Sequence, residues 1–182
     1  MNIDHRAQDD RIRTSQSSVI ARMQADPSAC ERTYTTKGQI RAGLACHIEQ
    51  GRLSAITDLG PAMGGDAAGP SPGFYARSAI VGCVGIGIKM LAVREGLVLE
   101  TLTVTVETDF DDTALMGLGA NAAAPMATRV VIDIESAEDT HSIAELVDRA
   151  LERDPWFLAL RDAQVVEPSV TVARRSPLDA VA

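Results

Sequence analysis

The alternation of apolar and polar residues predicts strands in the middle of the chain and helices around them. Over residues 97–109, Leu102, Val104 and Val106 fall on one face, and threonines and a glutamate fall on the other. In chain order the patterns predict a helical arm over 9–25, strands over 34–45 and 53–57, a helix over 72–95, strands over 97–109 and 128–134, helices over 140–153 and up to 161, and a strand over 165–172. Such a mixture predicts an α+β fold, not a doubly wound α/β fold.

The helix predicted over 72–95 has unusually clear ends and an unusual centre. Ser71 suits the N-cap, Pro72 the first helical position and Gly96 the C-terminal stop. Residues 79–88 are apolar on every face, which predicts a helix that is buried on all sides. Three glycines in this stretch each cost about 1 kcal/mol relative to alanine. They indicate a close neighbour, such as a second helix or the same helix of a second copy.

Helix-breaking residues and changes in the sequence pattern divide the chain into an arm, one domain and a tail. Asp26 and Pro27 end the first helical pattern, so residues 1–28 are predicted to form a helical or partly disordered arm. Residues 29–174 form the predicted domain, and 175–182 a flexible tail. Pro168 has no N–H to donate, which predicts that the last strand, over 165–172, lies at a sheet edge.

Composition and charge narrow the classes of function. Hydrophobic residues make up 46% of the 182 residues and aromatic residues only 3%, which indicates a globular protein with an aliphatic core. The net charge of −8 argues against partners such as nucleic acid or anionic membranes, which favour basic surfaces. The start of the chain shows no secretory signal pattern, and the apolar stretch of 79–88 is too short to span a bilayer. We therefore expect a cytoplasmic protein.

Three cysteines are the candidates for chemistry. Cys30, Cys46 and Cys83 are scattered, with no spacing typical of a zinc site, so neither a metal nor a cofactor is expected. In a reducing cytosol they should be free thiols. Taken alone, Cys83 fits a packed core residue, because free cysteines are among the most buried residue types.

Three segments resemble the OsmC/Ohr family of thiol peroxidases. Residues 63–72 are similar to the glycine- and proline-rich LGG…GPTP segment before the family's central helix. Residues 79–83 (AIVGC) resemble its AALGAC block, with Cys83 at the position of the reactive cysteine, and residues 95–100 (EGLVLE) resemble its RGLPLE segment. The resemblance implies an OsmC-like intertwined homodimer, in which antiparallel strands wrap around two long central helices.

The resemblance also implies a chemistry for Cys83 and a helper for it. A thiolate would attack an organic hydroperoxide and become a sulfenic acid. Arg41, in the segment Arg41-Ala42-Gly43, resembles the arginine that meets this thiolate in the peroxidase branch. Lowering a thiol pKa from about 8.5 to about 6 needs roughly 3.4 kcal/mol. One guanidinium at about 4 Å supplies near 4 kcal/mol at an effective dielectric of about 20.

The chain departs from the family pattern at two places. Where the family has its second cysteine, this sequence has Asp154, and Gly73 and Phe74 stand where it has a glutamate. Cys46 is the one substitute for the second thiol within the chain, so an external thiol reductant is expected instead. The leading hypothesis is one-cysteine reduction of organic hydroperoxides at Cys83, aided by Arg41. The alternative is a non-catalytic relative that binds a small apolar ligand at the dimer interface.

Overall fold

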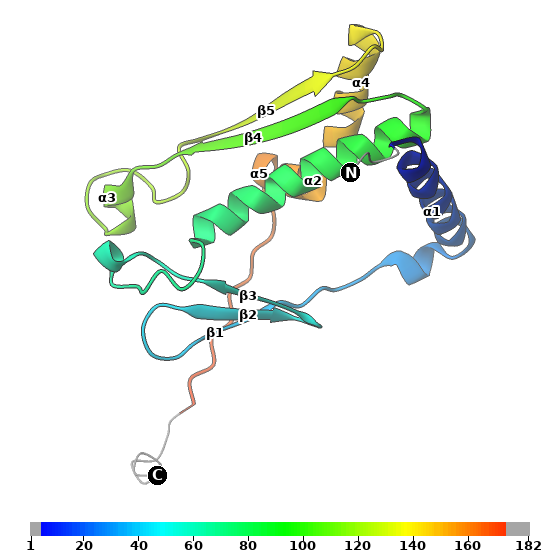
Figure 1. The fold of residues 1–182 in the computed structure, drawn as a ribbon. Coiled ribbons are helices and arrows are strands. Elements are labelled where there is room, and N and C mark those ends of the chain that lie inside the picture. The colour runs from blue at the N-terminus through cyan, green and yellow to red at the C-terminus, as the bar shows by residue number, and fades with distance from the viewer. Residues whose placement is uncertain (1–4, 174–182) are drawn as a thin grey trace.

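The computed structural model describes residues 5–173, which form two antiparallel sheets arranged around one long helix (Figure 1). The elements are α1 (His5–Ala25), β1 (Lys37–Ile40), β2 (Cys46–Gln50), β3 (Leu53–Thr57), α2 (Pro72–Glu95), β4 (Thr101–Asp109), α3 (Asp112–Leu115), β5 (Ala127–Glu135), α4 (Thr140–Leu151) and α5 (Pro155–Arg161). One sheet has the order β1-β2-β3 and the other pairs β4 with β5. The predicted α+β class is confirmed.

One face of α2 forms the core together with β4, β5 and α4. The two strands pair over nine residues each, from Thr101 opposite Glu135 to Asp109 opposite Ala127. Their alternating apolar side chains pack onto α2, as the sequence pattern predicts. The buried residues of this core are Ile80, Val84, Ile88, Leu91, Ala92, Leu99, Leu146 and Ala150.

The ends of α2 are set by the capping residues that the sequence indicates. The side-chain oxygen of Ser71 accepts a hydrogen bond from the Phe74 N–H at 3.2 Å. Gly96 has a φ of +79°, a left-handed conformation that favours glycine, and its N–H donates to the Ala92 carbonyl. The predicted helix over 72–95 is therefore confirmed.

The opposite face of α2 is exposed in one chain, and its expected burial against a second helix or a second copy stays a prediction. Ile86 is 63% exposed and Met90 is 37% exposed, because the core elements pack against the other face. By length and composition alone α2 could cross a membrane, but the core helix of a globular protein passes the same test, and one such helix is weak evidence.

The three-stranded sheet lies apart from the core (Figure 1). Its register places Gly38 opposite Ile48 and Glu49 opposite Ser54, and β1 is exposed along its whole length. The strand expected over 34–45 is in fact interrupted: β1 ends at Ile40, and a turn leads into β2. Gly43, with a φ of +73°, provides the left-handed conformation that this reversal needs.

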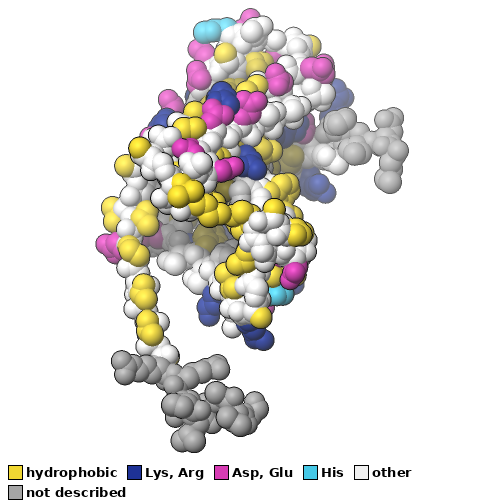
Figure 2. Space-filling model, turned by 90° about the vertical axis from the view of Figure 1, so that its left-hand side faces the viewer, with side chains coloured by type: hydrophobic (Ala, Val, Ile, Leu, Met, Phe, Trp, Pro, Cys, Tyr) yellow, Lys and Arg dark blue, Asp and Glu magenta, His cyan; other side chains and the backbone are white. Residues whose placement is uncertain are grey.

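Residues 163–173 do not form the strand that the sequence predicts. The segment has extended chain without a strand partner, and Val165, Val166, Val170 and Val172 are 82–88% exposed. Figure 2 shows these hydrophobic side chains along the segment that leads away from the domain. A strand exists only where another strand pairs with it, and residues 5–173 offer none here. The predicted tail of 175–182 lies outside the described residues.

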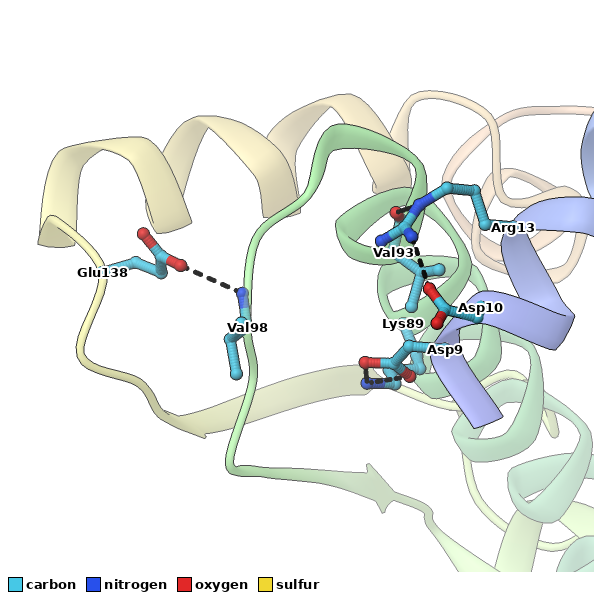
Figure 3. Close-up of polar contacts among 7 residues, drawn as sticks. All are labelled: Asp9, Asp10, Arg13, Lys89, Val93, Val98 and Glu138. Carbon is cyan, nitrogen blue, oxygen red and sulfur yellow. Dashed lines mark hydrogen bonds and ion pairs between the residues drawn. The ribbon is translucent and has the colours of Figure 1, made fainter. Parts of the chain in front are cut away.

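The N-terminal arm is a helix that docks on the C-terminal half of α2 through polar contacts (Figure 3). Lys89 forms an ion pair with Asp9 at 2.9 Å, and the Arg13 guanidinium donates a hydrogen bond to the Val93 carbonyl at 3.2 Å. Arg13 also pairs with Asp10 within α1. The division of the chain at residue 28 stays a prediction.

A single buried carboxylate holds the loop that leads into α2. Asp58 is 3% exposed, and its side chain accepts hydrogen bonds from the N–H groups of Leu59, Asp66 and Ala68 at 2.8–3.1 Å. The N–H of Ala68 is the strongest influence holding the pKa of Asp58 below its usual range, against the effect of burial. The loop is thereby fixed between the small sheet and the start of α2.

We predict that Asp58→Asn lowers the melting temperature at pH 7, because an amide oxygen cannot replace both carboxylate oxygens as acceptors. A lowered carboxyl pKa stabilises the fold above its unfolded-state value of about 3.9 and ceases to do so as the pH falls through the folded-state value. The difference between wild type and variant should therefore shrink below about pH 4. Thermal unfolding measured against pH tests this. Asp66→Asn, which changes an exposed side chain of the same loop, should have little effect.

Candidate functional site

Cys83 lies midway along α2, on the side that faces the junction between α4 and α5. It lines a cavity of about 400 Å³. Apolar residues from α2 form much of the wall, and three guanidinium groups stand around it. The lining residues are Cys83, Ile86, Gly87, Met90, Leu91, Arg94, Arg149, Ala150, Arg153, Asp154 and Pro155.

Asp154 is brought beside Cys83 by the way α5 begins. Asp154 is the N-cap of α5 and Pro155 its first residue, a pairing that fits the missing N–H of proline. The Oδ1 atom accepts the Phe157 N–H at 2.8 Å, and the residue is only 4% exposed. A Cβ atom at Gly87 would lie 3.4 Å from Oδ2. Since Gly87 follows Cys83 by about one helical turn, Oδ2 lies over the face of α2 that carries the thiol.

These surroundings favour the protonated thiol. Burial raises the pKa of Cys83, and the Asp154 carboxylate raises it further, both as a hydrogen-bond partner of the thiol and through its charge. The backbone N–H of Trp156 acts in the opposite direction. Within residues 5–173 no guanidinium contributes to this pKa. The arginines that line the cavity, Arg94, Arg149 and Arg153, are therefore not among the influences on this pKa.

The three arginines of the cavity differ in their pairing. Arg149 is bound to Glu95 at 2.7 Å and lies 3.7 Å from Glu145. For Arg94 and Arg153, the described residues provide no ion pair or hydrogen bond to the guanidinium. Sequence reasoning missed this cluster, although the spacing of Arg149 and Arg153, one turn apart and just before Asp154, could have indicated it.

The structure of one chain does not bring Arg41 to Cys83. Arg41 lies in the turn after β1, is exposed, and donates from Nε to the Gln39 side chain at 3.3 Å. Its expected role stays a prediction. Cys46 lies on β2, where its sulfur faces Gly38 so closely that a Cβ there would be 2.8 Å away. It does not line the cavity of Cys83.

A second and larger cavity lies between α1, α2 and β4. Its volume is about 820 Å³, and the exposed face of α2 forms one wall. Gln16 reaches it from α1, and its amide oxygen is buried without a hydrogen-bond partner within residues 5–173. The lining residues are Arg11, Ile12, Ser15, Gln16, Val81, Gly82, Gly85, Ile86, Lys89, Met90, Leu99, Glu100 and Leu102. No cluster of three metal-ligating side chains occurs in this described part of the chain.

Comparisons with known proteins agree with this architecture. The profile of a family described as OsmC-like protein matches residues 64–169, more than half of the chain. An OsmC-like protein from Mycoplasma pneumoniae has a similar structure at 15% identity, with a TM-score of 0.61 over 72% of this chain and 89% of that one. None of the curated proteins matches the sequence.

Two further solved structures show the same fold. An organic hydroperoxide resistance protein OsmC from Legionella pneumophila is 20% identical, with a TM-score of 0.51 over 72% of this chain and 92% of that one. An OsmC-like protein of unknown function from Vibrio cholerae is 11% identical, with a TM-score of 0.52 over 70% and 92%. The shared fold is therefore found both in a protein with a named role and in one without.

We predict that Asp154→Asn accelerates the alkylation of Cys83 by iodoacetamide at neutral pH. Removing the carboxylate lowers the thiol pKa and increases the thiolate fraction, which is the nucleophile. Asparagine retains the N-cap. Asp139→Asn is the matched control, because Asp139 caps α4 in the same way but is exposed. Peptide mapping of the labelled cysteines gives the rate at Cys83. An unchanged rate would show that the carboxylate does not control the thiol.

Proposed function

This chain belongs to the OsmC-like protein family, and we propose that it reduces organic hydroperoxides at Cys83 with an external thiol as the reductant. The observation that carries the proposal is the position of the Cys83 thiol in the wall of a largely apolar cavity of about 400 Å³. An alkyl group can lie against Ile86, Met90 and Leu91 while the peroxide reaches the sulfur. A reducing, cytoplasmic location, which would supply free thiols, is part of the proposal.

The reaction is balanced without a second protein thiol. The sulfur of Cys83 attacks the outer peroxide oxygen, the O–O bond breaks, and a sulfenic acid and an alcohol form. One external thiol then condenses with the sulfenic acid, releasing water and leaving a mixed disulfide. A second external thiol releases Cys83 and forms the external disulfide. Cys46 lies on β2, and the cavity is lined by helices and the turn before α5, which favours the external route.

We propose in addition that a second copy of the chain completes the fold as a homodimer. The small sheet has little core of its own, and a three-stranded sheet needs an apolar face that packs against something. The uncovered face of α2 and the exposed valines of 163–173 are apolar surfaces of the same kind. In such a dimer Arg41 of one copy would reach the cavity of the other and stabilise its thiolate.

One observation favours the second candidate function, which is non-catalytic binding of a small apolar ligand. The cavity of about 820 Å³ is larger than the one at Cys83, and it is lined by Gln16, whose buried amide oxygen has no hydrogen-bond partner among the described residues. A ligand with an apolar body and one hydrogen-bond donor would fit these surroundings. In that case the raised pKa of Cys83 would simply keep the thiol unreactive.

For the peroxidase function we predict that cumene hydroperoxide adds one oxygen atom to Cys83, seen by mass spectrometry of the intact chain and its peptides. In the presence of dithiothreitol the protein should then consume hydroperoxide over many turnovers. Cys83→Ser should abolish both results, whereas Cys30→Ser and Cys46→Ser serve as matched controls and should retain them. Failure of an excess of hydroperoxide to modify Cys83 would leave the ligand-binding candidate.

For the role of Arg41 we predict that Arg41→Gln slows the hydroperoxide reaction about tenfold or more, since a close guanidinium stabilises the thiolate by several kcal/mol. Arg52→Gln changes another exposed arginine, in the turn between β2 and β3, and should leave the rate of the hydroperoxide reaction unchanged.

For the proposed homodimer, sedimentation should give twice the 19.3 kDa mass of the chain.

Complementation distinguishes the two ways in which Arg41 can act. Co-expression of the Cys83→Ser and Arg41→Gln chains produces mixed dimers with one intact pair across the interface. These dimers should regain activity at one of their two sites. Absence of rescue would mean that Arg41 acts within its own chain or not at all.

A further inference from the structure

Asp154 is placed more specifically than its capping role requires. Capping α5 occupies Oδ1, and a serine or asparagine would cap as well. Asp139 caps α4 while exposed, whereas Asp154 is 4% exposed and its Oδ2 lies over the turn of α2 that carries Cys83 and Gly87. Burying a carboxylate is unfavourable unless it is paired. The Cys83 thiol lies on this side, in the wall of the same cavity as Asp154.

We propose that Asp154 takes the proton of the Cys83 thiol as the sulfur attacks the hydroperoxide, and passes it to the leaving alkoxide oxygen. The proposal rests on the proposed peroxidase function. In this chain a carboxylate that transfers a proton, Asp154, would stand at the position of the second cysteine in the family pattern.

The step is balanced within the site. The S–H bond breaks and its proton moves to Asp154, while the sulfur electron pair forms the S–O bond to the outer peroxide oxygen. The O–O bond breaks, and the alkoxide takes the proton from Asp154 and leaves as the alcohol. Sulfur is oxidised to the sulfenic acid, the peroxide is reduced, and Asp154 ends in its starting state.

The other charged groups around the thiol cannot accept its proton. Arg94 reaches the cavity from α2, Arg149 from α4 and Arg153 from the turn before α5. Guanidinium groups remain protonated and accept no hydrogen bonds. Arg41 of a second copy, if it reaches the site, is subject to the same limit. Asp154 is therefore the one proton acceptor among the charged groups that line the described cavity.

The test compares two reactions of Cys83 in wild type and Asp154→Asn. Alkylation by iodoacetamide releases iodide, which needs no proton, so its rate follows the thiolate fraction and should rise in the variant. Reduction of a hydroperoxide releases an alkoxide, which needs a proton, so its rate should fall about 100-fold. Across a series of hydroperoxides, the reduction rate of the variant should also depend more steeply than that of wild type on the acidity of the alcohol formed. Opposite changes in the two reactions support the proposal.

The pH profile gives a second readout that a merely structural role would not move. In the variant the hydroperoxide rate should rise with pH together with alkylation. In wild type it should persist at pH values where alkylation has become slow. Asp139→Asn should change neither reaction, and an unchanged melting temperature and Trp156 fluorescence would show that the Asp154→Asn chain is folded.

Two further outcomes overturn the proposal in distinguishable ways. If the variant reduces hydroperoxide as fast as wild type or faster, Asp154 only suppresses the thiolate, and the peroxidase function stands without it. If wild-type Cys83 is alkylated but hydroperoxide never modifies it, the peroxidase function fails, and the proton transfer fails with it.

Discussion

The packing of one face of α2 against β4, β5 and α4 is the constraint on which the rest of the structure depends. This packing fixes the orientation of the helix. As a result, Cys83 faces the α4–α5 junction, and the opposite apolar face of α2 is exposed. Each large aliphatic side chain buried there contributes about 1.5–3 kcal/mol. The start of α5 lies close to this helix, because a Cβ atom at Gly87 would be in van der Waals contact with the Asp154 carboxylate, 3.4 Å from Oδ2.

The sequence predicts best those elements that are determined by their own residues. The bounds of α2 follow from Ser71, Pro72 and Gly96, and β4 and β5 follow from strict alternation. The prediction is wrong where an element depends on a partner. The valines of 163–173 alternate too poorly with polar residues to reveal a face, and no strand in the described part of the chain pairs with them. The break after Ile40 depends on one left-handed glycine, which pattern alone does not distinguish from a strand residue.

The candidate site was predictable in its centre and not in its surroundings. Cys83 could be singled out because its segment resembles a family block, and Asp154 because it replaces a cysteine in the same resemblance. That these two residues, 71 positions apart in the sequence, line the same cavity follows from the tertiary packing, which local propensities do not contain. Arg149 and Arg153 are neighbours in the sequence, but the packing of α4 against α2 is what brings Arg94 to the same cavity.

Beside one sulfur, a carboxylate favours the protonated thiol, whereas a guanidinium favours the thiolate. Each, as a unit charge at about 4 Å, changes the thiol–thiolate balance by about 4 kcal/mol at an effective dielectric near 20. If both are in contact, their effects on the pKa largely cancel, and burial leaves the thiol protonated at rest. The carboxylate then accepts the proton, and the guanidinium stabilises the negative charge that remains on sulfur. Such a site differs from a permanent thiolate because its nucleophile is formed at the moment of attack, when a peroxide oxygen is present to receive the electron pair.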